Sequence, residues 1–135
     1  MKRILVIDDD EGLRRMLHLS LAEAGYAVTE AEDGKMGIEC LRTTPVDLVI
    51  TDLVMPNKEG LETILELRKA QPHLKIIAMS GGSRTSPRDN LAMAKSFGAA
   101  FVFSKPFALA EMIKTVADLM GAATPGTAER VLEPQ

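Results

Sequence analysis

The sequence predicts an α/β fold in which a doubly wound parallel sheet of five strands is covered by helices on both faces. Short apolar runs alternate with longer stretches that repeat apolar residues at helical spacing, and this alternation occurs five times along the chain. Such alternation is typical of parallel strands that are joined by crossover helices. With 135 residues and 46% hydrophobic content, the chain has the size of one ordinary domain with a substantial core.

The first two strand and helix units lie in the N-terminal third of the chain. The run ILVI at 4–7 is short and continuous, as expected of a strand that is covered on both faces. The stretch 11–25 carries an apolar stripe and ends at Gly25, which is typical of the end of a helix. A second strand is predicted at 26–31, and a helix interrupted by glycine follows at 33–43.

The other three units follow the same pattern. Their strands are predicted at 46–51, 74–79 and 100–103. Their helices are predicted in 55–70, 86–98 and 108–121. The first of these helices is broken by Pro56 and then resumes. Residues 122–135 are rich in small residues and proline and lack an apolar period, so they are predicted to form a flexible C-terminal tail after a single domain at 1–121.

The composition argues against several classes of function. The formal net charge is −3 and lysine and arginine form no long run, so DNA is not expected as a direct partner. Cys40 is the only cysteine, which excludes an internal disulfide. The first apolar run is too short for a signal peptide core or a membrane span. We therefore expect a soluble, cytoplasmic protein without a membrane partner.

Polar residues at the ends of the predicted strands are the candidates for a functional site, because ligands of open parallel sheets bind outside the carboxyl ends of the strands. These residues are Asp8, Asp9, Asp52, Ser80, Ser104 and Lys105. If the three aspartates converge, their carboxylates repel one another unless a cation lies between them. A small cluster of oxygen ligands with room for water suits Mg²⁺ better than Ca²⁺.

Lys105 and Ser80 add groups that a phosphoryl ligand needs. Lys105 supplies a compact positive charge, and the hydroxyl of Ser80 can donate a hydrogen bond. With a metal ion, these groups complement the oxygens of a phosphoryl group in transfer, for which catalysis is mostly positioning and charge stabilisation. One carboxylate is then free to act as the nucleophile.

Four segments in order, ILVIDDD, VDLVITDLVMPNKEG, IIAMSG and FSKPF, closely resemble the receiver domain of bacterial two-component response regulators. The resemblance covers roughly residues 1–121, and it is specific because each segment stands in order at the end of an apolar strand. It implies a flavodoxin-like (βα)5 three-layer sandwich with five helices. It also implies a chemotaxis-regulator-like signalling module that catalyses only its own phosphorylation and dephosphorylation and is not a turnover enzyme.

The resemblance implies a Mg²⁺-dependent phosphoacceptor site. Asp52 would accept the phosphoryl group. Asp8 and Asp9 would hold Mg²⁺ together with Asp52, and the backbone carbonyl of Val54 would be a further metal ligand.

The resemblance also assigns the groups that face the phosphate. Ser80 would bind a phosphoryl oxygen, Lys105 would form an ion pair with the phosphate, and the peptide bond between Lys105 and Pro106 would be cis. The implied partners are a histidine kinase or phosphotransfer protein and a downstream protein target. The protein itself is expected to be a monomer or a weak homodimer.

The expected switch residues are Ser80, Gly81, Gly82 and Val102. Val102 stands where many receivers carry a tyrosine or phenylalanine whose rotamer follows activation, and a valine is too small and too stiff to replace it. The interval from Ser80 to Gly98 is also about three residues longer than in the common pattern. We hypothesise that the polar segment 81–90 becomes ordered on phosphorylation instead, the alternative being an insertion without a role.

Two other interpretations stay open at the level of sequence. The run VIDDDEG also fits a phosphatase of the haloacid dehalogenase type, with Asp8 as nucleophile and Asp10 as the acid, but this leaves Asp52 unexplained. In the receiver interpretation Asp10 instead begins or caps the first helix. The chain is expected to be a single-domain response regulator, and the alternative is a receiver fragment of a longer transcription factor or hybrid kinase. His18 is interpreted as a surface group without a role.

Overall fold

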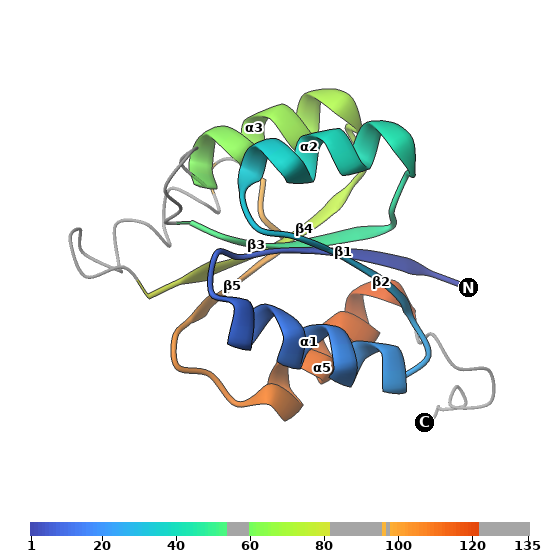
Figure 1. Cartoon of the computed structure of the whole chain (residues 1–135), viewed down its shortest axis with the longest axis vertical. Coiled ribbons are helices and arrows are strands. Elements are labelled where there is room, and N and C mark those ends of the chain that lie inside the picture. Colours follow the sequence, from blue (N-terminus) through green and yellow to red (C-terminus); the bar gives the residue numbers. More distant parts are fainter. Residues whose placement is uncertain (54–59, 82–95, 97, 122–135) are drawn as a thin grey trace.

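The computed structural model describes residues 1–53, 60–81, 96 and 98–121, and it contains one sheet of five parallel strands (Figure 1). The strands are β1 (Arg3–Ile7), β2 (Ala27–Ala31), β3 (Leu48–Asp52), β4 (Lys75–Ser80) and β5 (Phe101–Ser104). The helices of the described residues are α1 (Glu11–Glu23), α2 (Gly34–Thr43), α3 (Gly60–Ala70) and α5 (Leu109–Met120). The predicted α/β class and parallel sheet are confirmed.

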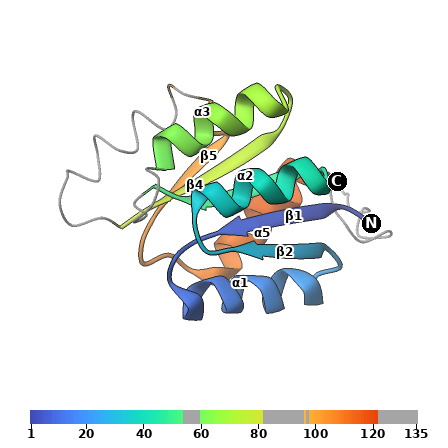
Figure 2. The same cartoon turned by 45° about the horizontal axis from the view of Figure 1, so that its top comes forward.

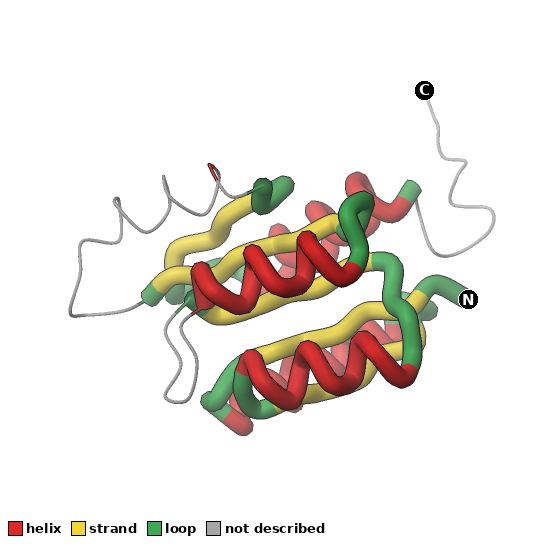
Figure 3. The backbone as a smooth tube through the Cα atoms, turned by 90° about the horizontal axis from the view of Figure 1, so that it is seen from above, coloured by secondary structure: helices red, strands yellow, loops and turns green. Residues whose placement is uncertain are grey.

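Two layers of helices cover the sheet. Helices α2 and α3 lie on one face and α1 and α5 on the other, and Figure 3 looks onto the layer of α2 and α3. Each face has its own apolar core, and β1 contributes to both, with Leu5 and Ile7 in one cluster and Ile4 and Val6 in the other. All four residues are fully buried, which explains why this run is apolar without interruption.

The strand order β2-β1-β3-β4-β5 determines where a site can form. The chain passes from β1 to β2 on one side of the sheet and from β3 through β4 to β5 on the other. The direction of winding therefore reverses between β1 and β3, and ligands of open α/β sheets bind at such a switch point. The carboxyl ends of all five strands meet at the edge that lies at the left in Figures 1 and 2.

Element boundaries differ from the predicted ones by one or two residues. Strands β3 and β4 extend to Asp52 and Ser80, so these residues end their strands and do not follow them. Helix α1 begins after Asp10, whose side chain accepts a hydrogen bond from the Leu13 N–H at 3.2 Å, which confirms the predicted cap. Gly25 follows α1 with a φ of 107°, a conformation that favours glycine, as the predicted helix end requires.

Three predictions fall on parts of the chain that the structure does not describe. The helix in 86–98 lies almost wholly outside the described residues, as does the start of the predicted stretch 55–70. The tail at 122–135 also lies outside them. Among the helices that the structure describes, none has both the length and the apolar content needed to cross a membrane.

Candidate functional site

The three predicted carboxylates converge at the carboxyl ends of two neighbouring strands. Asp8 and Asp9 directly follow β1, and Asp52 ends β3. Ile7 pairs with Thr51 in the parallel register of these strands, so the residues after them lie side by side. Each of the three side chains places a carboxylate oxygen within 4.8 Å of the other two. Asp8 is fully buried and Asp52 is 5% exposed, whereas Asp9 is exposed to solvent.

Lys105 brings an ammonium group to this cluster from the far end of the chain. Its Nζ lies 3.0 Å from Oδ2 of Asp8 and 3.3 Å from Oδ2 of Asp52. The Lys105 N–H donates to the carbonyl of Ser80 at 2.7 Å, which continues the pairing of β4 with β5 and holds the lysine backbone in place. The expected cis peptide bond between Lys105 and Pro106 is present.

The buried charges at this site perturb one another. Burial raises the pKa of the Asp8 carboxyl, and hydrogen bonds from the Asp10 N–H and from Lys105 offset only part of this effect. Burial opposes the charge of Lys105, but its ion pairs with Asp52 and Asp8 outweigh burial and raise its pKa, so the ammonium persists at neutral pH. Three carboxylates against one ammonium leave an excess of negative charge, which suits a hard divalent cation.

Ser80 contributes a buried hydroxyl at the carboxyl end of the strand next to β3. It ends β4, one position beyond Met79, which pairs with Asp52 in the register of β3 and β4. Ser80 is 1% exposed, and its Oγ has no hydrogen-bond partner among the described residues. A buried hydroxyl without a partner costs about 1–3 kcal/mol, so an acceptor from a ligand would relieve this cost.

Gly81 provides the space through which the lysine reaches the cluster. A Cβ at Gly81 would lie 2.8 Å from the Cβ of Lys105 and 2.9 Å from its Cδ, which is too close for carbon atoms. The side chain of Lys105 therefore passes over Gly81 on its way to Asp8 and Asp52. The sequence predicted Gly81 only as a switch residue, and nothing in the sequence indicated that it leaves space for the Lys105 side chain.

The other predicted site residues differ in how far the structure describes them. Val54 and Gly82 lie outside the described residues. Ser104 ends β5 and is exposed. Val102 is partly buried and packs against the core cluster on the side of α2 and α3. The aromatic rings on β5 belong to its neighbours, and the ring centroids of Phe101 and Phe103 lie 4.8 Å apart.

A second set of charged groups lies beside the acidic cluster and was missed by sequence reasoning. Arg14 of α1 donates from Nη1 to the main-chain carbonyl of Asp8 at 2.8 Å and from Nε to Glu30 of β2 at 2.9 Å. His18, whose side chain is 29% exposed, places Nδ1 2.5 Å from Oε2 of Glu30, so this partly exposed histidine has a carboxylate partner. Arg14 and Glu30 are 16 positions apart and lie on different elements, and no local pattern in the sequence predicts such a contact.

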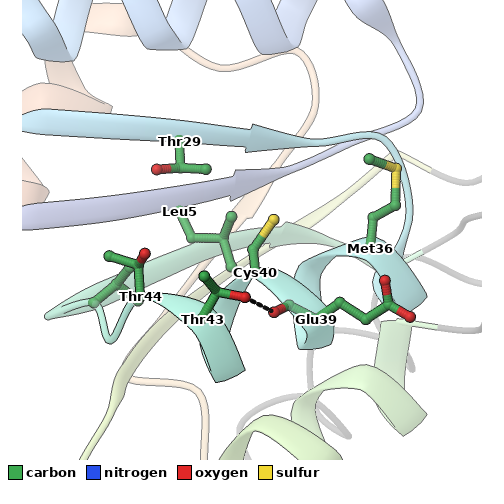
Figure 4. A pocket seen from close by; sticks show the side chains of 8 residues that line it. Leu5, Thr29, Met36, Glu39, Cys40, Thr43 and Thr44 are labelled. Atoms are coloured by element: carbon green, nitrogen blue, oxygen red, sulfur yellow. Dashed lines mark hydrogen bonds between the residues drawn. The ribbon is translucent and has the colours of Figure 1, made fainter.

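A hollow of about 310 Å³ lies outside the site, between α2 and the strands β1 and β2 (Figure 4). It is lined by Leu5, Thr29, Met36, Glu39, Cys40, Thr43, Thr44 and Val46. Burial, with a smaller effect from Glu39, raises the pKa of the Cys40 thiol, so this cysteine is a poor nucleophile. None of the strand-end residues lines this hollow, which separates it from the acidic cluster.

Comparison with known proteins agrees with this geometry. A family model described as the response regulator receiver domain matches residues 4–117. The response regulator receiver protein CpdR of Brucella abortus (strain 2308) is 34% identical over 123 residues, which cover 91% of this chain and 100% of that protein. The response regulator MprA of Mycolicibacterium vanbaalenii is also 34% identical over 91% of this chain, but the chain spans only 52% of MprA.

Solved structures share the fold as well. The response regulator TrrA of Thermotoga maritima, solved in complex with Mg(2+)-BeF, is 34% identical and has a TM-score of 0.74, covering 88% of this chain and 99% of that chain. The flavodoxin-like arrangement expected from the resemblance is thereby confirmed. The family model spans most of the chain, and the carboxylates and the ammonium group that it implies meet at the ends of the strands. This chain is therefore a receiver domain of the response regulators of two-component signalling.

Proposed function

We propose that the chain accepts a phosphoryl group on Asp52 from a histidine kinase or a phosphotransfer protein, in a reaction that requires Mg²⁺. The observation that carries this proposal is the convergence of Asp8, Asp9 and Asp52 with the ammonium of Lys105. Among the described residues, no other group of three or more histidine, cysteine, aspartate or glutamate side chains could hold a metal ion.

The acidic residues fit Mg²⁺ as a cofactor. Asp8, Asp9 and Asp52 offer hard oxygen ligands within a few ångströms of one another, and the exposure of Asp9 leaves room for water. The main-chain carbonyl of Val54 is proposed as a further ligand. When bound, Mg²⁺ would neutralise negative charge on the acidic cluster and on the phosphoryl oxygens.

The protein groups have complementary roles in the transfer step. A carboxylate oxygen of Asp52 attacks phosphorus, an O–P bond forms, and the bond from phosphorus to the nitrogen of the donor imidazole breaks with its electrons going to that nitrogen. Lys105 pairs with the phosphoryl oxygens, and the Ser80 hydroxyl donates a hydrogen bond to one of them. In the separate dephosphorylation step, a water oxygen attacks phosphorus, the bond between phosphorus and the Asp52 oxygen breaks, inorganic phosphate is released and the Asp52 carboxylate is restored.

The proposed output is a change in binding to a downstream protein. Ser80, Gly81, Gly82 and Val102 are the proposed switch, with the segment 81–90 taking over the role of the absent aromatic side chain. We propose a domain at 1–121 followed by a flexible tail at 122–135, a monomer or weak homodimer, cytoplasmic and without direct contact to nucleic acid. Single-domain status is part of this proposal; the chain matches CpdR over its whole length, whereas it spans 52% of MprA.

The phosphatase alternative has less support. It assigns Asp10 as the acid, but the Asp10 carboxylate accepts the Leu13 N–H and caps α1. It also leaves the ion pair between Lys105 and Asp52 without a purpose.

The test is labelling with acetyl phosphate and Mg²⁺, followed by intact mass and peptide mapping. We expect one phosphoryl group on the wild-type chain and none on Asp52→Asn. Asp47→Asn is the matched control, because Asp47 immediately precedes β3 at its opposite end and accepts the Arg3 N–H there. Equal labelling of Asp52→Asn would refute the assignment, and an adduct mapped to Asp8 would favour the phosphatase.

A further inference from the structure

Arg14 connects the acidic cluster to the edge strand of the sheet. Its guanidinium donates through Nη1 to the main-chain carbonyl of Asp8 at 2.8 Å and through Nε to Oε1 of Glu30 at 2.9 Å. The side chains of Arg14 and Glu30 are only 13% and 16% exposed. Two acceptors therefore hold the guanidinium, namely the Asp8 carbonyl just after β1 and the Glu30 carboxylate within β2.

The carbonyl that Arg14 holds belongs to the peptide that joins Asp8 to Asp9. Because a peptide unit is planar, fixing this carbonyl also fixes the N–H of Asp9 and the direction in which the chain leaves Asp8. The N–H of Asp8 is bonded separately to the carbonyl of Ala31 at 3.1 Å. The backbone of Asp8 is thus held on one side by β2 and on the other by Arg14.

Glu30 is a suitable anchor for this contact. It lies within β2, where its backbone pairs with Val6 of β1. Burial disfavours its charge, but hydrogen bonds from His18 and Arg14 and the nearby charge of Arg15 outweigh burial and lower the pKa of Glu30. The anchor therefore stays ionised at neutral pH, and it ties Arg14 to the rigid sheet.

We propose that Arg14 is a positioning residue of the phosphoryl-transfer site, which orients the peptide between Asp8 and Asp9 so that both carboxylates face the divalent cation. This inference rests on the proposed function. The planar fork of arginine can bond a carbonyl and a carboxylate at the same time, whereas the single ammonium of lysine cannot reproduce this geometry.

The sign of the effect separates positioning from simple electrostatics. Arg14 is a positive charge close to a cation site, so its removal by charge alone would strengthen the binding of Mg²⁺. Loss of orientation would instead weaken binding. Removal of groups that orient metal ligands typically reduces metal affinity by about 10-fold or more.

The experiment measures the Mg²⁺ affinity of the full chain by calorimetry for the wild type, Arg14→Gln, Arg14→Lys and Glu30→Gln. Arg15→Gln is the matched control, because Arg15 is the next residue of α1 and also pairs with Glu30, at 3.5 Å, while its side chain is 58% exposed. We expect both Arg14 variants and Glu30→Gln to bind Mg²⁺ about 10-fold more weakly, and Arg15→Gln to bind within about 2-fold of the wild type. In the metal-free proteins, the amide NMR signal of Asp9 should shift in the Arg14 variants and not in Arg15→Gln.

Other outcomes overturn the inference. If Arg14→Gln binds Mg²⁺ as tightly as the wild type or more tightly, Arg14 does not position the ligands. If the Arg14 and Glu30 variants do not fold, as judged by circular dichroism, the role of these residues is structural and the inference also fails. Suppose that the wild type binds Mg²⁺ and is phosphorylated, but that the Arg14 variants have the same Mg²⁺ affinity as Arg15→Gln. That result refutes only the positioning role of Arg14. A wild type that binds no Mg²⁺ refutes the proposed function itself.

Discussion

A side chain at Gly37 of α2 is predicted to destabilise the fold, because Gly37 packs directly on Ile7, the last residue of β1. A Cβ built on Gly37 would lie 2.4 Å from Cδ1 and 2.9 Å from Cγ1 of Ile7. Carbon atoms in contact are normally about 3.5–4.0 Å apart, so one of the two groups must move by roughly 1 Å. Ile7 is fully buried and surrounded by the core cluster, so it cannot yield without displacing neighbours.

The expected effect of Gly37→Ala is the difference between two opposing contributions. Overpacking of a buried site costs about 1–3 kcal/mol. Replacing glycine by alanine inside a helix stabilises the folded state by up to about 1 kcal/mol. We expect a net loss of about 1 kcal/mol in the free energy of unfolding, measured by urea denaturation. Gly12→Ala in α1 is the control, because its Cβ would meet only Oδ1 of Asp10, at 3.4 Å, and we expect no loss there.

A double-mutant cycle with Ile7→Val tests the stated cause. Valine lacks the Cδ1 atom that makes the 2.4 Å contact, and the Ile7→Val change alone costs about 0.5–1.5 kcal/mol. In the Ile7→Val background, Gly37→Ala should cost less than in the wild type, with a coupling of at least about 0.5 kcal/mol. Equal costs in both backgrounds, or a stabilising Gly37→Ala in the wild type, would show that the contact with Ile7 is not the cause.

Three further predictions concern the site and its surroundings. Burial opposes the charge of Glu30, but its hydrogen bonds with His18 and Arg14 and the charge of Arg15 outweigh burial and lower its folded-state pKa below the ordinary 4.5. The contribution of Glu30 to stability is therefore complete above that pH and is lost as the pH falls through the folded pKa. Glu30→Gln should therefore lose less unfolding free energy than the wild type between neutral pH and about pH 3, and parallel curves would contradict this. Gly81→Ala should displace Lys105 and slow phosphorylation by acetyl phosphate by up to about 100-fold, and an unchanged rate would show that the lysine has another route. Asp9→Ala should weaken Mg²⁺ binding sharply in calorimetry because it removes a ligand, whereas an unchanged affinity would exclude Asp9 from the metal site.

Local patterns in the sequence are enough to predict the alternation of strands and helices and the residues that stand at the strand ends. These features depend on periodicity, since a continuous apolar run such as Ile4 to Ile7 requires burial on both faces. Parallel strands also share one edge for their carboxyl ends, so the sequence alone places Asp8, Asp52 and Ser80 at that edge. The cap of α1 by Asp10 is predictable for the same local reason.

Which of these residues touch one another depends on the tertiary structure. The strand order places β1 beside β3, and this pairing brings Asp8 to Asp52. The contact between Lys105 and Asp8 joins residues 97 positions apart, and its geometry depends on the space left by Gly81. The link from Arg14 to Glu30 and to the Asp8 carbonyl depends on how α1 is rotated and placed against β2. Local periodicity shows which face of an element is buried, but it carries no information about the register between elements, and register decides which side chains meet.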